Sequence, residues 1–268
     1  METIRAIFLA IIQGITEFLP VSSSAHLILA PKLLGWEDQG LAFDVAVHVG
    51  TLLAVIIFLR HEITKIIPAW LGGFKGLVWN EWGKLGWWVV LATLPVALAG
   101  LLGKNLIEQF LREPWVVASA TTLFAILLLY ADKNASQNQR DLVKMTLIHA
   151  LLFIGVAQAF ALIPGTSRSG VTMTMALFLG YKREAAAKFS FLLAVPTILF
   201  GGLFAAKDVI EQGAQYQWTP LIIGTLVSAV FALLCMRWFM SFLQTVGMRP
   251  FVYYRILLAI VIVLVFYL

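Results

Sequence analysis

The chain has 268 residues, of which 61% are hydrophobic and only 12% are charged. Soluble domains usually carry about 25% charged residues, so this composition excludes an ordinary soluble protein and indicates an integral membrane protein. In such a protein the net charge of +5 reports membrane topology rather than nucleic-acid binding, and the single cysteine, Cys235, excludes an internal disulfide and a cysteine metal cluster.

Residues 2–34 form the first predicted element. An apolar arm leads into Pro20-Val-Ser-Ser-Ser24, and a shorter arm follows it to Gly35. Non-helical backbone at membrane depth is tolerated only where protein or a cavity satisfies its polar groups. We therefore expect a re-entrant helical hairpin over 2–34, with its polar turn inside the membrane.

The remaining elements repeat one order: a broken hairpin followed by three spans. A second hairpin is expected over 146–180, and its Pro164-Gly-Thr-Ser turn resembles the first turn as a Pro-x-[Ser/Thr]-Ser frame, with the two prolines 144 residues apart. Each span is long enough to cross a hydrocarbon core of about 30 Å. The six expected spans are 43–60, 84–103, 115–131, 186–205, 219–240 and 250–268.

This order predicts a single all-α membrane domain over 1–268, built from two halves at about 1–131 and 142–268. Because each half contains an odd number of spans, the second half must enter the membrane from the opposite side. The prediction is therefore an inverted-topology repeat, an architecture that is common in transporters and that places the site at the repeat interface.

Basic residues assign the two sides of the membrane. Five of them fall on one side and twelve on the other, while Arg168 and Arg255 lie within apolar segments. The side richer in Lys and Arg is expected to be cytoplasmic. Both termini then face outward, the first hairpin enters from outside, the second enters from the cytoplasm, and their tips meet.

The second hairpin carries the sharpest chemical signal. Its turn places Arg168 among small and hydroxylated residues just before an apolar helix resumes. Glycines let backbone amides approach a ligand, a helix N-terminus suits phosphate, and arginine adds a planar fork for phosphate oxygens. We expect an anion cradle, or alternatively an ion pair between Arg168 and Glu17 that only tethers the hairpins. The expected phosphate-binding residues of this turn are Gly165, Thr166, Ser167, Arg168, Ser169 and Gly170.

The first hairpin carries Glu17, Ser22, Ser23, Ser24 and His26. A buried carboxylate can act as an acid, a base or a metal ligand. His26 follows Ser23 by three residues, which places a hydroxyl nucleophile one helical turn from a base. Alternatively, the serines are helix N-caps and His26 is a structural hydrogen-bonding residue. Ser22 and Ser24 are further candidate phosphate ligands.

Three other polar residues are weaker candidates. Gln13 lies four residues before Glu17 on the same helix face and can assist it. His48 lies within the 43–60 span and is expected to support the site or to pack. Arg255 lies near the start of the last span and is expected to snorkel toward a membrane surface.

These motifs resemble a known family over the whole chain. Gln13-Gly-Ile-Thr-Glu17-Phe-Leu-Pro-Val-Ser-Ser23-Ser-Ala-His26 closely resembles the first signature of the bacterial undecaprenyl-diphosphate phosphatases, the bacitracin-resistance proteins. Pro164-Gly-Thr-Ser-Arg168-Ser-Gly-Val-Thr172 resembles their second signature. The stretch Phe189-Ser-Phe-Leu-Leu-Ala-Val-Pro196 is also similar to that family.

The resemblance implies hydrolysis of undecaprenyl diphosphate to the monophosphate, which recycles the lipid carrier of cell-wall synthesis. It also implies a divalent cation, Mg²⁺ or Ca²⁺, a homodimer, and an outward-facing site in the bacterial inner membrane. By position, Glu17, Ser23, His26 and Arg168 fall on the family's functional residues. Gln13 falls on the first position of its Glu/Gln-x-x-x-Glu element, which leaves Glu17 as the main candidate metal ligand or base.

Two mechanisms and one different function stay open at this point. In the first mechanism Ser23 is the nucleophile and His26 its base or the acid for the leaving oxygen. In the second, water attacks directly, with Glu17 or His26 as base and Ser23 as a phosphate ligand. The different function is a polyprenyl-phosphate flippase on the same inverted-repeat scaffold.

Overall fold

The computed structural model describes residues 2–74, 79–111, 113–211 and 217–267, without the side chains of 104–109 and 206–211. Its elements in these ranges are helices, and Arg140 and Tyr181 form an isolated β-bridge. Six helices are long and apolar enough to cross a membrane, which confirms the predicted all-α architecture with six candidate spans. They are α3 (Leu41–Phe58), α5 (Glu81–Phe110), α6 (Pro114–Lys133), α9 (Arg183–Glu211), α10 (Trp218–Thr245) and α11 (Arg249–Tyr267).

Both predicted hairpins are pairs of helical arms around a proline-containing break. Proline lacks a backbone N–H and disfavours helical geometry in the residue before it, so Pro20 and Pro164 end the helices that precede them. The arms on either side of each break contact one another. They are α1 (Thr3–Thr16) and α2 (Ser23–Leu34) in the first segment, and η3 (Ile148–Gly155), α7 (Val156–Ala159), η4 (Phe160–Leu162) and α8 (Arg168–Phe178) in the second.

The two breaks end in the same local structure. Ser22 caps α2 and Ser167 caps α8, with positive φ angles of 75° and 70°. Each hydroxyl oxygen accepts a hydrogen bond from the amide three residues later, at 3.4 Å from Ala25 and 3.1 Å from Gly170. Positive φ is uncommon for residues other than glycine and is found most often at functional sites.

These matching caps correct the expected register between the two turns. Aligning the prolines pairs Ser23 with Ser167, whereas the capping geometry pairs Ser22 with Ser167 and therefore Ser23 with Arg168. The shift of one residue arises because the second turn contains one more residue between proline and cap than the first. Ser23 and Arg168 thus occupy equivalent first positions of α2 and α8.

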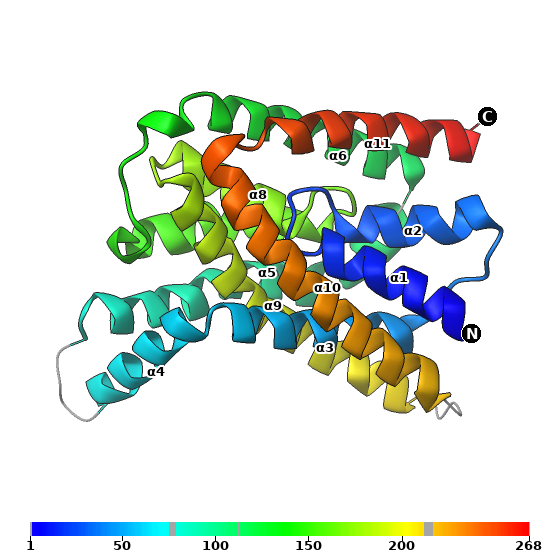
Figure 1. Cartoon of the computed structure of the whole chain (residues 1–268), viewed down its shortest axis with the longest axis horizontal. Coiled ribbons are helices and arrows are strands. Elements are labelled where there is room, and N and C mark those ends of the chain that lie inside the picture. The colour runs from blue at the N-terminus through cyan, green and yellow to red at the C-terminus, as the bar shows by residue number, and fades with distance from the viewer. Residues whose placement is uncertain (1, 75–78, 112, 212–216, 268) are drawn as a thin grey trace.

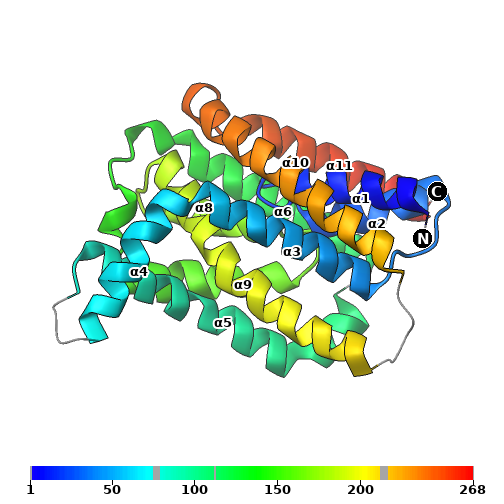
Figure 2. The ribbon, with the colours of Figure 1, turned by 60° about the horizontal axis from the view of Figure 1, so that its bottom comes forward.

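The helices place the two breaks together near the middle of the molecule. α3 packs against α9 and α10, and α6 packs against α11. Figures 1 and 2 show α1 and α2 in the half that holds both termini, and α8 in the other half. The breaks contact each other, since Ser169 Oγ donates to the carbonyl oxygen of Leu19 at 2.7 Å. The prediction that the two tips meet is confirmed.

The stretch between the first two expected spans contains a helix. The polar stretch 60–84 contains α4 (Arg60–Phe74), which packs against α5 at the end of the molecule opposite to the termini (Figure 2). Its first turn is polar, and Glu62 is the one residue of this helix that is buried. Of the basic residues used to assign the sides, Lys75 and Arg112 lie outside the described residues, as do the side chains of Lys104 and Lys207.

Candidate active site

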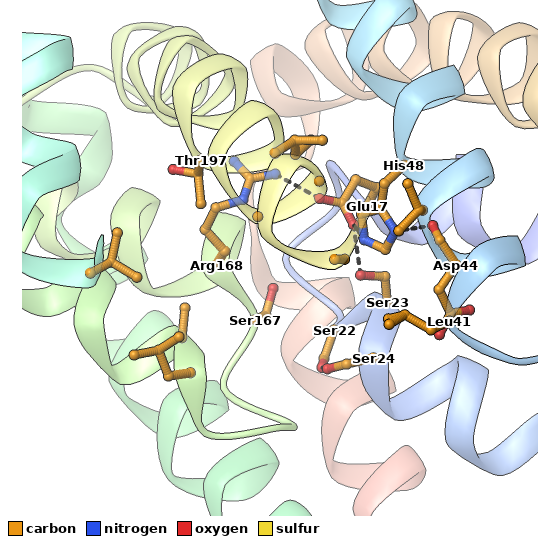
Figure 3. Close-up of a pocket in the computed structure, with 18 residues that line it drawn as sticks. Glu17, Ser22, Ser23, Ser24, Leu41, Asp44, His48, Ser167, Arg168 and Thr197 are labelled. Atoms are coloured by element: carbon orange, nitrogen blue, oxygen red, sulfur yellow. Dashed lines mark hydrogen bonds and ion pairs between the residues drawn. The ribbon is translucent and has the colours of Figure 1, made fainter. Parts of the chain in front are cut away.

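A cavity of about 350 Å³ lies where the two breaks meet (Figure 3). Its lining combines apolar residues with a few polar groups, as in ligand-binding pockets generally. The polar lining comes from both breaks, α3 and α9: Glu17, Ser22, Ser23, Ser24, Asp44, His48, Ser167, Arg168 and Thr197. The apolar lining includes Leu41, Val45, Val96, Leu162 and Ile198.

Glu17 is the centre of the polar side chains in Figure 3. It is only 8% exposed. Its Oε1 accepts from Arg168 Nη2 at 3.0 Å, and its Oε2 accepts from Ser23 Oγ at 2.7 Å and from Gln13 Nε2 at 2.9 Å. A buried carboxylate is costly unless it is paired and hydrogen-bonded, and these three donors meet that cost.

The hydroxyl of Ser23 is hydrogen-bonded to a carboxylate rather than to the predicted histidine. Both ring nitrogens of His26 have other partners: Nδ1 lies 2.7 Å from the Ser22 carbonyl oxygen and Nε2 lies 2.5 Å from the Tyr254 hydroxyl. The expected Ser23–His26 contact is therefore not formed, because His26 turns back to the cap and toward α11. A nucleophile within hydrogen-bond reach of a base is the arrangement required for covalent catalysis, and here the group within that reach of Ser23 is the Glu17 carboxylate.

Arg168 lies at the other side of the same carboxylate. Its Nη2 donates to Glu17 and its Nη1 donates to the Ser190 carbonyl oxygen at 3.0 Å. The side chain is 11% exposed and lines the cavity. The ion pair with Glu17 that the sequence offered as the alternative to a cradle is therefore present, and Arg168 also lines the cavity.

The remaining residues of the second turn divide into two groups. Ser167 lines the cavity, where its hydroxyl caps α8. The other four predicted phosphate ligands, Gly165, Thr166, Ser169 and Gly170, are not among the lining residues. The carbonyl oxygens of Gly165 and Thr166 instead accept from Arg255, each at 2.9 Å. Of the six residues expected to form a continuous cradle, therefore, only Ser167 and Arg168 line the cavity, and the rest of this turn contacts protein.

Comparisons with known proteins agree with this site. Residues 6–261 match the family described as bacitracin resistance protein BacA. The chain belongs to this family. It is 52% identical over 258 residues to an undecaprenyl-diphosphatase of Saccharophagus degradans, covering 96% of both chains. It is also 51% identical over 261 residues to an undecaprenyl-diphosphatase of Chromohalobacter salexigens, covering 97% of this chain and 98% of that protein.

In this BacA family member, His48 lies closer to the centre of the site than its sequence context predicts. Its Nε2 lies 3.7 Å from Glu17 Oε2, and its Nδ1 lies 2.7 Å from the Asp44 carbonyl oxygen. Since a carbonyl oxygen only accepts, Nδ1 carries the proton and Nε2 is the nitrogen that faces the carboxylate. In the sequence, His48 follows Asp44 by four residues within an apolar span. This spacing does not show that both residues line the same cavity as Glu17 and Arg168.

The donor atoms near Glu17 fit a hard divalent cation only if the substrate supplies ligands as well. Among the described residues, no group of three His, Cys, Asp or Glu side chains forms a metal site. Gln13 Oε1 is buried and has no hydrogen-bond partner, while Nε2 of the same amide donates to Glu17. Mg²⁺ is commonly held by one or two carboxylate ligands together with substrate phosphates and water. The Glu17 carboxylate matches that mode of binding, and Gln13 Oε1 would join it only after the amide turns, because Nε2 now faces Glu17.

Proposed function

We propose that this protein hydrolyses undecaprenyl diphosphate to undecaprenyl phosphate and phosphate, which recycles the lipid carrier for cell-wall synthesis and confers bacitracin resistance. Its relatives named undecaprenyl-diphosphatase cover nearly the whole chain. The observation that carries the proposal is the hydrogen bond of 2.7 Å from Ser23 Oγ to Glu17, with Arg168 on the other carboxylate oxygen. These three groups are the base, the nucleophile and the phosphate ligand that phosphoryl transfer requires.

The first chemical step is a transfer to Ser23. Arg168 binds the terminal phosphate and stabilises the charge that develops on its oxygens. Ser23 Oγ attacks the terminal phosphorus while its proton moves to Glu17 Oε2. The bond from that phosphorus to the bridging oxygen breaks, and undecaprenyl phosphate leaves with the bridging oxygen.

The second step returns the enzyme to its starting state. Water attacks the phosphoserine phosphorus, and the bond from phosphorus to Ser23 Oγ breaks. Ser23 Oγ takes back from Glu17 the proton that it gave in the first step, and the oxygen and both protons of the water leave with the phosphate. His26 does not face the cavity, so we assign it to holding the Ser22 carbonyl and the turn that presents Ser23. Direct attack by water remains the alternative mechanism, with Glu17 as base and Ser23 as a phosphate ligand.

A divalent cation, Mg²⁺ or Ca²⁺, is part of this proposal. Glu17 and the amide oxygen of Gln13 would hold it together with the substrate phosphates. The cation would neutralise phosphate charge during transfer.

The membrane arrangement is proposed as two re-entrant hairpins in an inverted-topology repeat of the bacterial inner membrane. In its support, the termini share one end of the molecule, and the two broken segments approach the centre from opposite halves (Figure 1). The positive-inside rule places the termini and the cavity mouth on the periplasmic side. With Cys235 replaced by alanine, a cysteine introduced at either terminus should react with an impermeant reagent on intact cells. Reaction only after permeabilisation would reverse the orientation.

A homodimer, implied by the family resemblance, is also proposed, and the mass of the purified protein in detergent tests it. The comparisons give no support to the flippase alternative. Release of phosphate from undecaprenyl diphosphate by purified protein in detergent is the direct test of the function. Absence of release, with lipid movement in vesicles, would replace the phosphatase with a flippase.

Replacement of Arg168 by lysine should lower kcat/KM about 100-fold, as loss of one charge-stabilising donor does elsewhere. Lysine keeps the charge but lacks the planar fork that contacts Glu17 and Ser190 together. Initial rates of phosphate release measure the effect. Arg237→Lys, at an exposed position of α10, is the matched control and should keep wild-type rates. Equal rates for both variants would remove Arg168 from the phosphate site.

A further inference from the structure

Arg255 is a fully buried arginine in the membrane helix α11. It does not line the cavity, so it is not a candidate substrate ligand. The expectation that it snorkels to a membrane surface is wrong, because its side chain is 0% exposed. A buried guanidinium persists only where its donors are hydrogen-bonded, so its partners indicate why the helix carries it.

Among the described residues, the Arg255 guanidinium has four hydrogen-bond partners, all backbone carbonyl oxygens, and they come from both breaks and from α6. In the second break, Nη2 donates to Gly165 and Thr166, each at 2.9 Å. In the first break, Nη1 donates to Pro20 at 3.4 Å. Nε donates to Thr121 of α6 at 3.2 Å. One rigid side chain therefore links the two turns to each other and to α6.

Gly170 makes room for this side chain, and Gly165 makes room for the neighbouring helix α6. Gly165 has a φ of 91°, and a Cβ there would overlap the Val117 carbonyl oxygen. A Cβ at Gly170 would lie 2.7 Å from Arg255 Nη1. These glycines were expected to admit phosphate, but their surroundings show that they admit the guanidinium and its neighbouring backbone.

We propose that Arg255 is a positioning residue that holds the two halves of the active site at their working separation. Pro20 lies between Glu17 and Ser23 in the chain, and Thr166 lies two residues before Arg168. Fixing these two carbonyls therefore fixes the base and nucleophile on one side against the phosphate ligand on the other. This role rests on the phosphatase function proposed above.

The kinetic test compares Arg255→Lys and Arg255→Met with the wild type. Arg255→Met should lower kcat about 100-fold, since a misplacement of about 1 Å has effects of that size. KM should change little, because Arg255 does not touch the substrate. Arg255→Lys should be intermediate, since lysine retains donors without the fork. Arg249→Lys and Arg249→Met, at an exposed position of the same helix, are the controls and should match the wild type.

A substitution at Gly170 perturbs the position of the Arg255 side chain without changing the arginine itself. Gly170→Ala should lower kcat because its methyl group displaces Arg255 Nη1. Gly100→Ala, whose Cβ would meet only Leu162 side-chain atoms at 3.7 Å or more, is the matched control. Wild-type kcat in both Arg255→Met and Gly170→Ala would overturn the inference. So would a loss of rate matched by an equal loss of folded protein.

A distance measurement separates this inference from the proposed reaction. Spin labels at Ile28→Cys on α2 and Phe178→Cys on α8, both exposed positions, report the separation of the two segments in a Cys235→Ala background. Arg255→Met should broaden the distance distribution, and Arg249→Met should leave it unchanged. An unchanged distribution in Arg255→Met would refute the positioning role. If the wild type released no phosphate but Arg255→Met still broadened the distance distribution, the proposed phosphatase function would be wrong and the positioning role of Arg255 would be supported.

Discussion

Replacing Glu17 with glutamine should lower kcat about 1,000-fold, within the range found for loss of a general base. The variant keeps the shape of the side chain but not its negative charge, so it cannot take the proton of Ser23. It also loses the charge that pairs with Arg168 at 3.0 Å. Phosphate release under saturating substrate measures the change in kcat.

The matched control for this prediction is Glu62→Gln. Glu62 is also 8% exposed, and it pairs with Lys188 at 3.0 Å, so it reproduces the burial and ion pairing of Glu17 outside the cavity. We expect it to keep wild-type kcat even if the purified protein unfolds at a lower temperature. Similar rates for the two variants would mean that Glu17 acts only in folding.

The spans and the breaks could be predicted from sequence because local chemistry determines them. The predicted limits of the six spans agree within five residues with the parts of these helices that are apolar enough to cross a membrane, and α5 and α9 continue beyond those parts. Long apolar runs are helical wherever water is excluded. Pro20 and Pro164 interrupt their helices because proline has no backbone N–H and its ring clashes with the preceding helical turn. Glu17, Ser23 and Arg168 were found because charges and hydroxyls are rare in such segments.

The contacts within the site could not be predicted, because they depend on residues distant in the chain. His26 and Ser23 are close enough in sequence to form a pair, but Tyr254, on α11, takes up the imidazole. Gly165 and Gly170 suit a phosphate loop by composition, and only the packing of α11 shows that they surround Arg255. Spacing thus predicts which residues share a site and leaves their partners undetermined.

Ser23→Ala should lower kcat about 1,000-fold or more, since the variant lacks the nucleophile of a covalent route. The hydroxyl donates to Glu17 at 2.7 Å, so its loss removes both the attacking oxygen and one partner of the carboxylate. Ser228→Ala is the control, because Ser228 is fully buried and donates to the Val47 carbonyl at 2.9 Å away from the cavity. It should keep wild-type kcat.

Trapping the intermediate distinguishes the two mechanisms that the geometry allows. A phosphoserine ester survives an acid quench, so wild-type protein stopped during turnover of substrate labelled in the terminal phosphate should carry label on Ser23. The Ser23→Ala variant should carry none. Absence of label from the wild type, with a loss of only about tenfold in Ser23→Ala, would assign the attack to water. Glu17 would then be the base for that water, and the Ser23 hydroxyl would serve to orient the phosphate beside Arg168.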